Sequence, residues 1–290
     1  MKLKINKIQA KSVLTPSKLP GADWVVNSYV GCSFGCKYCY AAFIGRWKHP
    51  GKEWGSFVDV KINAPEILKK ELLKLERKHG SKNFGSILFS SVTDPYLGIE
   101  AKYQITRKCL EVLFGFGYQG EISILTKSPL ATRDIDLFKK LNISVGFTVT
   151  TLEDKVVRFL EGNAPPASAR IKALKQLYEA GIFTYAFIGP LLPHFTVQKE
   201  KLEQLFTKLE SIGIKEVWLE HIHFTPIVKG RLFKYLEKQA PGLIPEFKKA
   251  DTQEYRNQLE KIIKSALMGK NLKLGLNEVI YHRKVKQLNK

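Results

Sequence analysis

Residues 31–40 read GCSFGCKYCY and place Cys32, Cys36 and Cys39 in a C-x3-C-x2-C spacing directly after the first predicted strand. The two glycines of this stretch allow the chain to turn tightly, so the three thiolates can converge. Iron–sulfur clusters usually take four cysteine ligands, so three thiolates leave one iron with an open position. An open iron can bind and activate a small molecule. The spacing therefore predicts a catalytic iron–sulfur site.

Two other uses of these cysteines are open. A zinc site would take His49 as its fourth ligand, although zinc knuckles more often pair two short Cys or His elements and a second pair is missing here. A disulfide with spare thiols is disfavoured, because the chain has four cysteines and three lie within eight residues. The fourth, Cys109, lies on a predicted helix and is expected to be a buried core residue.

Between residues 24 and 224, short apolar stretches alternate with amphipathic segments. Strands are expected at 24–30, 86–91, 121–126, 143–150, 184–192 and 216–224, and helices at 65–79, 105–114, 134–141, 167–180 and 197–212, the third of these capped by Asp134. This alternation predicts an α/β fold with a parallel sheet and crossover helices. Functional groups are then expected at the carboxyl ends of the strands.

The charge of the chain is strongly positive. Its 290 residues carry 47 lysines and arginines against 27 acids, a net charge of +20, and 44% are hydrophobic, which excludes a disordered or fibrous protein. Such an excess favours an acidic partner, DNA or RNA first. A solvated lysine-rich surface is the alternative. No apolar run approaches the roughly 20 residues of a membrane span, and no signal-type stretch opens the sequence, so a cytoplasmic protein is expected.

The basic residues are concentrated at the ends, which suggests three parts. Residues 1–23 form an N-terminal basic segment and residues 24–225 the α/β unit. Residues 226–290 form a basic, mainly helical C-terminal extension, with 15 lysines and arginines against 6 acids. Helices are expected in it at 230–239 and 252–268, and a strand at 272–281.

The cysteine motif in this context resembles the radical S-adenosylmethionine superfamily. The segments SSVTDPYLGIE, ILTKSPLATRDID and TTLEDKVVRFLEGNAPPASARIKALKQLYEAG resemble its spore photoproduct lyase branch, above all the broader "DNA repair photolyase" relatives, over residues 22–195. The resemblance implies a partial (β/α)6 TIM-type barrel. It also implies a 4Fe–4S cluster that is reduced by a protein such as ferredoxin or flavodoxin. The cluster cleaves S-adenosylmethionine to a 5′-deoxyadenosyl radical, which abstracts hydrogen from a substrate.

The resemblance assigns cofactor contacts to five residues. Tyr38 matches an aromatic residue near the adenine, and Thr93 matches a serine that contacts the ribose. Asp94 follows and could orient a hydroxyl, in addition to starting a turn with the proline after it. Lys127 matches a lysine that holds the cofactor carboxylate, and Thr148 stands in place of a serine that contacts the same group.

Three positions bear on the radical reaction. Tyr38 and Tyr40 match two tyrosines of the lyase that are tied to radical relay. Ser91 stands where the lyase has a cysteine that donates hydrogen to the product radical. A hydroxyl O–H bond is much stronger than a thiol S–H bond, so this serine is a poor donor. We therefore expect a radical enzyme that does not repair spore photoproduct.

Four further residues are weaker candidates. His221 and His223 alternate on the sixth expected strand and are predicted to share a face, and His194 follows the fifth strand. Arg170 opens a helix, where it binds an anion or pairs with an acid. The substrate class is open between nucleic acid, preferred from the charge, and a peptide or small metabolite. A non-catalytic nucleic-acid-binding module that holds zinc or a cluster is the competing class.

Overall fold

The computed structural model describes residues 3–282 and is built around an eight-stranded sheet with the order β11-β10-β9-β8-β7-β6-β3-β2. The strands are β2 (Leu14–Pro16), β3 (Trp24–Val26), β6 (Ile87–Phe89), β7 (Ile122–Thr126), β8 (Ile143–Thr148), β9 (Phe183–Leu191), β10 (Glu216–His221) and β11 (Lys273–Leu274). All neighbours from β3 to β11 pair in parallel, and β2 pairs antiparallel at the edge. The six expected strands are confirmed in their expected order.

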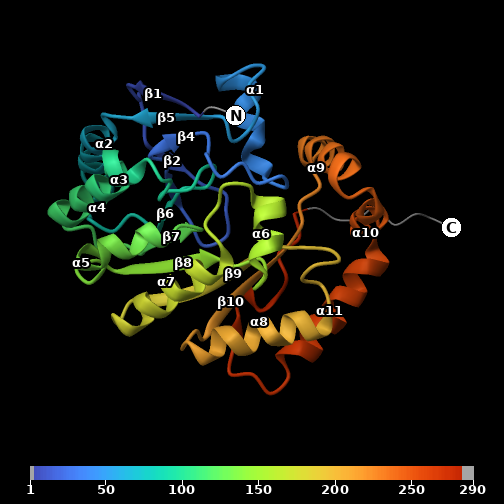
Figure 1. Cartoon of the computed structure of the whole chain (residues 1–290). Helices are drawn as coiled ribbons and strands as arrows, with labels where there is room; N and C mark the ends of the chain where they lie inside the picture. Colours follow the sequence, from blue (N-terminus) through green and yellow to red (C-terminus); the bar gives the residue numbers. More distant parts are fainter. Residues whose placement is uncertain (1–2, 283–290) are drawn as a thin grey trace.

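Helices cover the sheet between successive strands (Figure 1). They are α1 (Ile44–Lys48), α2 (Ala64–His79), α3 (Glu100–Tyr103), α4 (Ile105–Phe116), α5 (Ile135–Phe138), α6 (Asp154–Glu161), α7 (Ala167–Glu179), α8 (Lys199–Ser211), α9 (Pro226–Gln239), α10 (Ile244–Lys249) and α11 (Gln253–Leu267), with 3₁₀ turns η1 (Tyr40–Phe43), η2 (Pro129–Asp134), η3 (Pro241–Leu243) and η4 (Gly275–Asn277). The central strand β8 is buried at all six positions, with α7 against its outer face and its inner face toward the inside of the barrel. The parallel sheet with crossover helices is the one that the alternation predicts, and its form is the partial barrel that the resemblance implies.

The first expected strand is divided between two sheets. Residues 24–26 form β3 of the main sheet, whereas β4 (Tyr29–Val30) pairs with β5 (Phe57–Lys61) in a second sheet of order β1-β5-β4. The N-terminal segment, for which no secondary structure was predicted, contains strand β1 (Lys4–Ile8). This strand pairs in parallel with β5. The small sheet thereby supports the start of the cysteine stretch.

The C-terminal segment continues the main sheet. Strand β11 adds to β10, and Ile280 forms a further parallel bridge to Glu220, although most of the strand expected at 272–281 is irregular. Helix α11 packs on α8, and α9 lies next to η1 (Figure 1). The two helices expected at 230–239 and 252–268 are confirmed as α9 and α11.

Across residues 3–282, the structure contains no helix that is both long and apolar enough to cross a membrane.

Candidate functional site

A cavity of about 470 Å³ lies inside the partial barrel and reaches the carboxyl ends of its strands. Its walls include every residue for which the sequence predicted a role in cofactor binding or radical chemistry: Cys32, Cys36, Tyr38, Cys39, Tyr40, Thr93, Asp94, Lys127 and Thr148. These residues span more than a hundred positions of sequence. They meet because the loops after parallel strands open on the same edge of the sheet.

The cysteine loop depends on backbone conformations that glycine adopts easily. Gly31 has φ +83° and Gly35 has φ +67°. A Cβ on Gly31 would lie 2.6 Å from the carbonyl oxygen of Phe57, so a larger residue would displace the small sheet. These glycines therefore fix the path on which the three cysteines reach one cavity.

The cysteines are free thiols in a buried setting. Cys32 and Cys36 are buried, and Cys39 is partly exposed. Burial, with the nearby Glu161 charge, raises the pKa of Cys36 to about 12 against the opposing effect of Lys127. Binding of a metal centre to such thiols displaces their protons and supplies the missing countercharge. Cys109 is fully buried on α4, as expected, and does not line the cavity.

The cavity also contains unsatisfied polar atoms. The hydroxyl of Ser90 and the indole N–H of Trp54 are buried, line the cavity and have no hydrogen-bond partner within the described chain. Buried polar groups are normally paired, so such atoms fit a bound polar molecule. Three thiols on one wall and these polar atoms on others suit a cluster and a small polar cofactor held side by side.

The zinc alternative loses its proposed fourth ligand. The Nε2 atom of His49 lies 2.8 Å from Asp59 Oδ2, and the ring packs on Phe57 outside the cavity.

Lys127 follows directly after β7 and projects toward the cysteines. Its Nζ lies 5.9 Å from the centre of the Tyr38 ring. Of the described residues that line the cavity, Lys127 is the single lysine or arginine. A carboxylate bound there would find its positive partner in this side chain.

Asp94 ties two strand ends together. Its carboxylate accepts hydrogen bonds from Thr126 Oγ1 at 2.6 Å, from the Lys127 N–H at 2.8 Å and from the Tyr96 N–H at 2.8 Å. Burial raises the pKa of this carboxyl, and the hydrogen bonds from Thr126 and Lys127 oppose the shift. The Tyr96 contact is the turn predicted from the Asp-Pro pair. Asp94 therefore sets the position of the Lys127 backbone.

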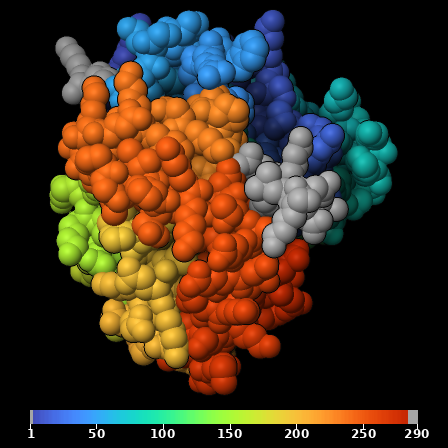
Figure 2. All heavy atoms as spheres, turned by 90° about the vertical axis from the view of Figure 1, so that its right-hand side faces the viewer, coloured from blue at the N-terminus to red at the C-terminus, as the bar shows by residue number. Residues whose placement is uncertain are grey.

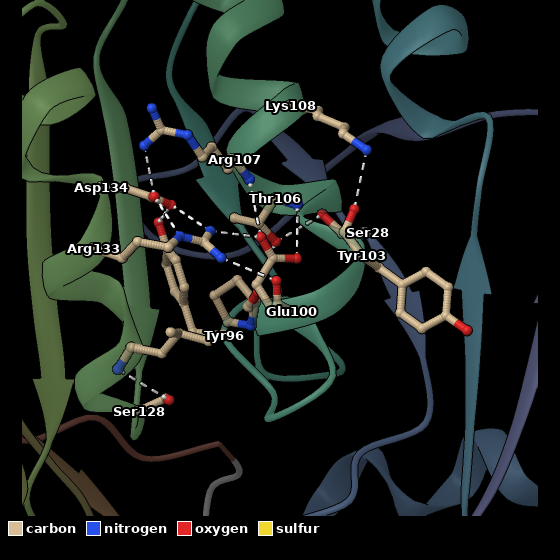
Figure 3. A network of polar contacts seen from close by, with 12 residues as sticks. Ser28, Tyr96, Glu100, Tyr103, Thr106, Arg107, Lys108, Ser128, Arg133 and Asp134 are labelled. Carbon is tan, nitrogen blue, oxygen red and sulfur yellow. Dashed lines mark hydrogen bonds and ion pairs between the residues drawn. The ribbon is translucent and has the colours of Figure 1, made fainter.

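A second polar cluster lies behind the cavity wall (Figure 3). Glu100 pairs with Arg133 at 2.9 Å, and the Tyr96 hydroxyl donates to Asp134 at 3.0 Å. Arg107 reaches Asp134 from α4 at 2.9 Å. The expectation that Asp134 caps a helix was wrong, because its carboxylate is buried in this cluster and makes no cap. The cluster joins Tyr96 and Glu100 of the TDPYLGIE segment to Arg133 and Asp134 of the TKSPLATRD segment.

The sequence did not indicate Glu161, which is the most connected residue behind the cysteines. This buried carboxylate at the end of α6 accepts hydrogen bonds from Tyr38, from Thr150 at 2.6 Å and from Arg170. Burial alone would raise its pKa, but Lys127 and Arg170 lower it to about 2. The acid that Arg170 was expected to pair with is thus an internal glutamate.

Arg231 on α9 forms hydrogen bonds with the backbone of the cysteine loop. Its guanidinium donates to the carbonyl oxygens of Cys36, Lys37 and Cys39 at 3.3–3.5 Å. The Lys37 N–H also donates to Leu160 O at 2.8 Å. The loop is therefore braced by the end of α6 and by the C-terminal segment.

His221 and His223 do not lie on one face, contrary to the prediction. His221 lies on the face of β10 opposite to Trp218 and Glu220, which line the cavity, and its Nε2 pairs with Ala250 O at 2.9 Å. Strand β10 ends at His221, so its alternation does not extend to His223. Burial and Arg256 lower the pKa of His221 to about 4. His223 does line the cavity, so the expectation that the two share a face was wrong.

Three acids that the sequence did not indicate, Glu121, Glu216 and Glu220, line the cavity, whereas His194 does not. Glu220 lines the cavity and pairs with His282 at 2.6 Å, and the His282 ring stacks on His223 at 4.3 Å. Alternation along β10 with Trp218 could have indicated Glu220. His194 is exposed and lies outside the cavity lining.

Ser91 and Tyr40 meet at the cavity edge. The Tyr40 hydroxyl donates to the carbonyl oxygen of Ser91, and both residues line the cavity. The position compared with the hydrogen-donating cysteine thus faces the cavity.

A partial parallel barrel with a three-cysteine loop at its carboxyl edge defines a class of cofactor-dependent α/β-barrel proteins. The chain belongs to the radical SAM superfamily, whose family model matches residues 26–209. Members of this superfamily are enzymes that use S-adenosylmethionine and a 4Fe–4S cluster.

Two curated relatives and one solved structure are similar to the chain. It is 45% identical over 193 residues to an uncharacterized protein of Methanocaldococcus jannaschii, covering 66% of this chain and 69% of the relative. It is 23% identical over 217 residues to spore photoproduct lyase of Clostridium acetobutylicum, covering 74% and 61%. A spore photoproduct lyase variant with bound AdoMet and dinucleoside spore photoproduct superposes with a TM-score of 0.71 at 16% identity, over 94% of this chain and 81% of the other.

Proposed function

We propose that the chain is a radical SAM enzyme in which Cys32, Cys36 and Cys39 hold a 4Fe–4S cluster. The observation that carries the proposal is the meeting of the three thiols and Lys127 in one cavity at the carboxyl edge of the sheet. When bound, the cluster and S-adenosylmethionine supply a 5′-deoxyadenosyl radical for hydrogen abstraction. The residues of the chain bind and orient these groups and exclude water.

The cofactor contacts that we propose follow the resemblance, and the chemistry of each side chain is compatible with its role. Lys127 is placed to pair with the cofactor carboxylate, and Thr148 lies on the neighbouring strand. Tyr38 is fixed by its hydrogen bond to Glu161 and offers its ring as a packing surface for adenine. Thr93, whose hydroxyl donates to Gly31 O, is assigned to the ribose by the resemblance, and Asp94 beside it is assigned to orient a hydroxyl; both line the cavity.

Replacing Lys127 with alanine is expected to weaken S-adenosylmethionine binding by about tenfold or more while the cluster is retained. A charge-assisted hydrogen bond contributes roughly 1.5–3 kcal/mol, which corresponds to that change. Calorimetric titration of the reconstituted protein measures it. Lys172→Ala, an exposed lysine on α7, is the control. Equal affinity for the wild type and Lys127→Ala would remove this lysine from the site.

For the substrate, we propose a nucleic acid. The support is the net charge of +20, of which residues 226–290 carry +9, together with the likeness to spore photoproduct lyase. The cavity is too narrow for a duplex, so a single nucleotide would enter while the backbone binds to the outer surface. Ser91 is a poor hydrogen donor, so the reaction we propose is not repair of spore photoproduct.

Nucleic-acid binding is expected to weaken steeply with salt, because cations that neutralise phosphates release counterions. Four exposed lysines of the C-terminal segment are to be replaced together by glutamine: Lys234, Lys238, Lys248 and Lys249. The log–log salt dependence should then become flatter by about one unit for each phosphate that these lysines neutralise in the wild type. Fluorescence anisotropy with a labelled oligonucleotide measures the slope.

Deleting residues after 225 is a poorer test, because it removes β11 and the Arg231 brace. An unchanged slope in the four-lysine variant would favour a lysine-rich surface without this role, and a peptide or metabolite as substrate.

A further inference from the structure

The segment that follows Cys39 exposes aromatic and basic side chains on the outer side of the cysteine loop. We call this the α1 surface and define it by Phe43, Arg46, Trp47, Lys48 and Lys52. The Trp47 side chain is 79% exposed and Phe43 is 39% exposed. Tryptophan is seldom left so exposed on a protein that has no partner, and grouped exposed aromatic residues mark interaction sites.

A second cavity, of about 400 Å³, lies between the α1 surface and α9. Three of its lining residues are cations, Arg46, Lys52 and Arg231, against the single acid Glu53. Figure 2 shows this face, with the light-blue segment that contains α1 directly against the orange segment of α9. The positive lining suits an acidic partner.

This second cavity lies one layer of side chains away from the cysteines. Trp54 lines both cavities, so its indole separates them. Along η1, Ala41 lines the cysteine cavity and Ala42 lines the second. Arg231 lines the second cavity while its guanidinium donates to the carbonyl oxygens of the cysteine loop. A group bound on the outer side would thus lie close to the cysteines without entering the substrate cavity.

We propose that the α1 surface is the docking site of an acidic electron-donor protein that carries a reduced flavin or iron–sulfur centre. The inference rests on the proposed function, in which the cluster receives its electron from outside. One electron leaves the donor's centre, which is oxidised, and the cluster is reduced by the same electron; no atom is transferred. The cations steer the acidic donor, and Trp47 supplies an aromatic anchor at the interface.

A nucleic acid would also match the charge and the aromatic rings, but it fits the location less well. A base bound at the α1 surface is separated from the cavity that contains Lys127 by Trp54 and η1. A substrate has to cross that wall, whereas an electron passes through a layer of side chains. The surface therefore favours the donor protein.

The test compares two reductants on the reconstituted full chain. Stopped-flow bleaching of the cluster measures reduction by a flavodoxin or ferredoxin, and by dithionite, which needs no docking site. The variants are the triple reversal Arg46→Glu, Lys48→Glu, Lys52→Glu and the single Trp47→Ala. The matched control is Lys69→Glu, Lys70→Glu, Lys74→Glu, which reverses three exposed lysines on α2 and changes the net charge equally.

The α1 triple reversal is expected to slow reduction by the protein donor by roughly tenfold or more at low salt, because steering depends on local charge. Trp47→Ala should weaken the donor's affinity, whereas dithionite reduces all variants at the wild-type rate. Calorimetry of flavodoxin with the cluster-free chain should show the same ranking of affinities, so this test remains informative even if no cluster assembles.

Three results would overturn the proposal. Equal slowing by the α2 control would show that net charge alone matters. Equal slowing with dithionite would show that the α1 surface only supports the cysteine loop. Loss of oligonucleotide binding in the α1 variants, with donor affinity unchanged, would assign the surface to nucleic acid.

Discussion

Cys36→Ala, like Cys32→Ala or Cys39→Ala, is expected to abolish binding of iron and sulfide after anaerobic reconstitution. The three thiols line one cavity, and the chain offers no spare cysteine there. Two thiolates cannot hold a cluster that ordinarily takes three or four. Iron and sulfide analysis, together with the visible absorption of the cluster, measures the loss.

Cys109→Ala provides the matched control. This thiol is fully buried on α4 and lies outside the cavity lining, so its removal should cost some stability but leave the cluster content at the wild-type level. Loss of the cluster in Cys109→Ala, or its retention in Cys36→Ala, would contradict the assignment of the ligands.

Glu161→Gln is expected to destabilise the chain by about 3–5 kcal/mol, because it leaves Arg170 buried without its countercharge. Both side chains are fully buried, and Tyr38 and Thr150 also donate to the same carboxylate. Urea denaturation of the cluster-free protein measures the change. Glu179→Gln, which removes an exposed partner of Lys175, should have little effect.

The same carboxylate makes stability depend on pH. Its pKa is lowered from 4.5 to about 2 in the folded chain. The unfolded chain therefore binds this proton more readily, and the stabilisation is fully present above about pH 4.5 and is lost as pH falls toward 2. A shift of this size contributes about 3 kcal/mol. Glu161→Gln should remove this part of the loss of stability at acid pH. If the variant loses as much stability as the wild type between pH 4.5 and 2, groups other than Glu161 cause the loss.

The features that sequence predicts well are local. Three cysteines in ten residues and six strands in regular alternation are read from neighbouring residues. The parallel sheet then brings residues as distant as Cys32 and Thr148 to one edge. Because strand ends share that edge, the meeting of these residues was predictable without knowledge of individual contacts, whereas the choice of residues came from the resemblance.

The features that sequence missed depend on contacts between distant segments. Arg231 reaches the carbonyl of Cys36 across 195 positions, and no motif marks it. In the sequence, Glu161 looks like any acid at the end of a helix. Only the structure shows that it is buried and paired with Arg170. The two histidines were assigned to one face by strict alternation, but β10 ends at His221, so the alternation does not continue to His223.

One measurement tests the central claim most directly. The full chain is reconstituted anaerobically with iron and sulfide and incubated with S-adenosylmethionine and dithionite, and 5′-deoxyadenosine is quantified. The account predicts a protein with about four irons per chain that forms 5′-deoxyadenosine, and no product from Cys36→Ala. A wild-type protein that retains zinc without iron, or that holds the cluster and binds S-adenosylmethionine without cleaving it, would contradict the account.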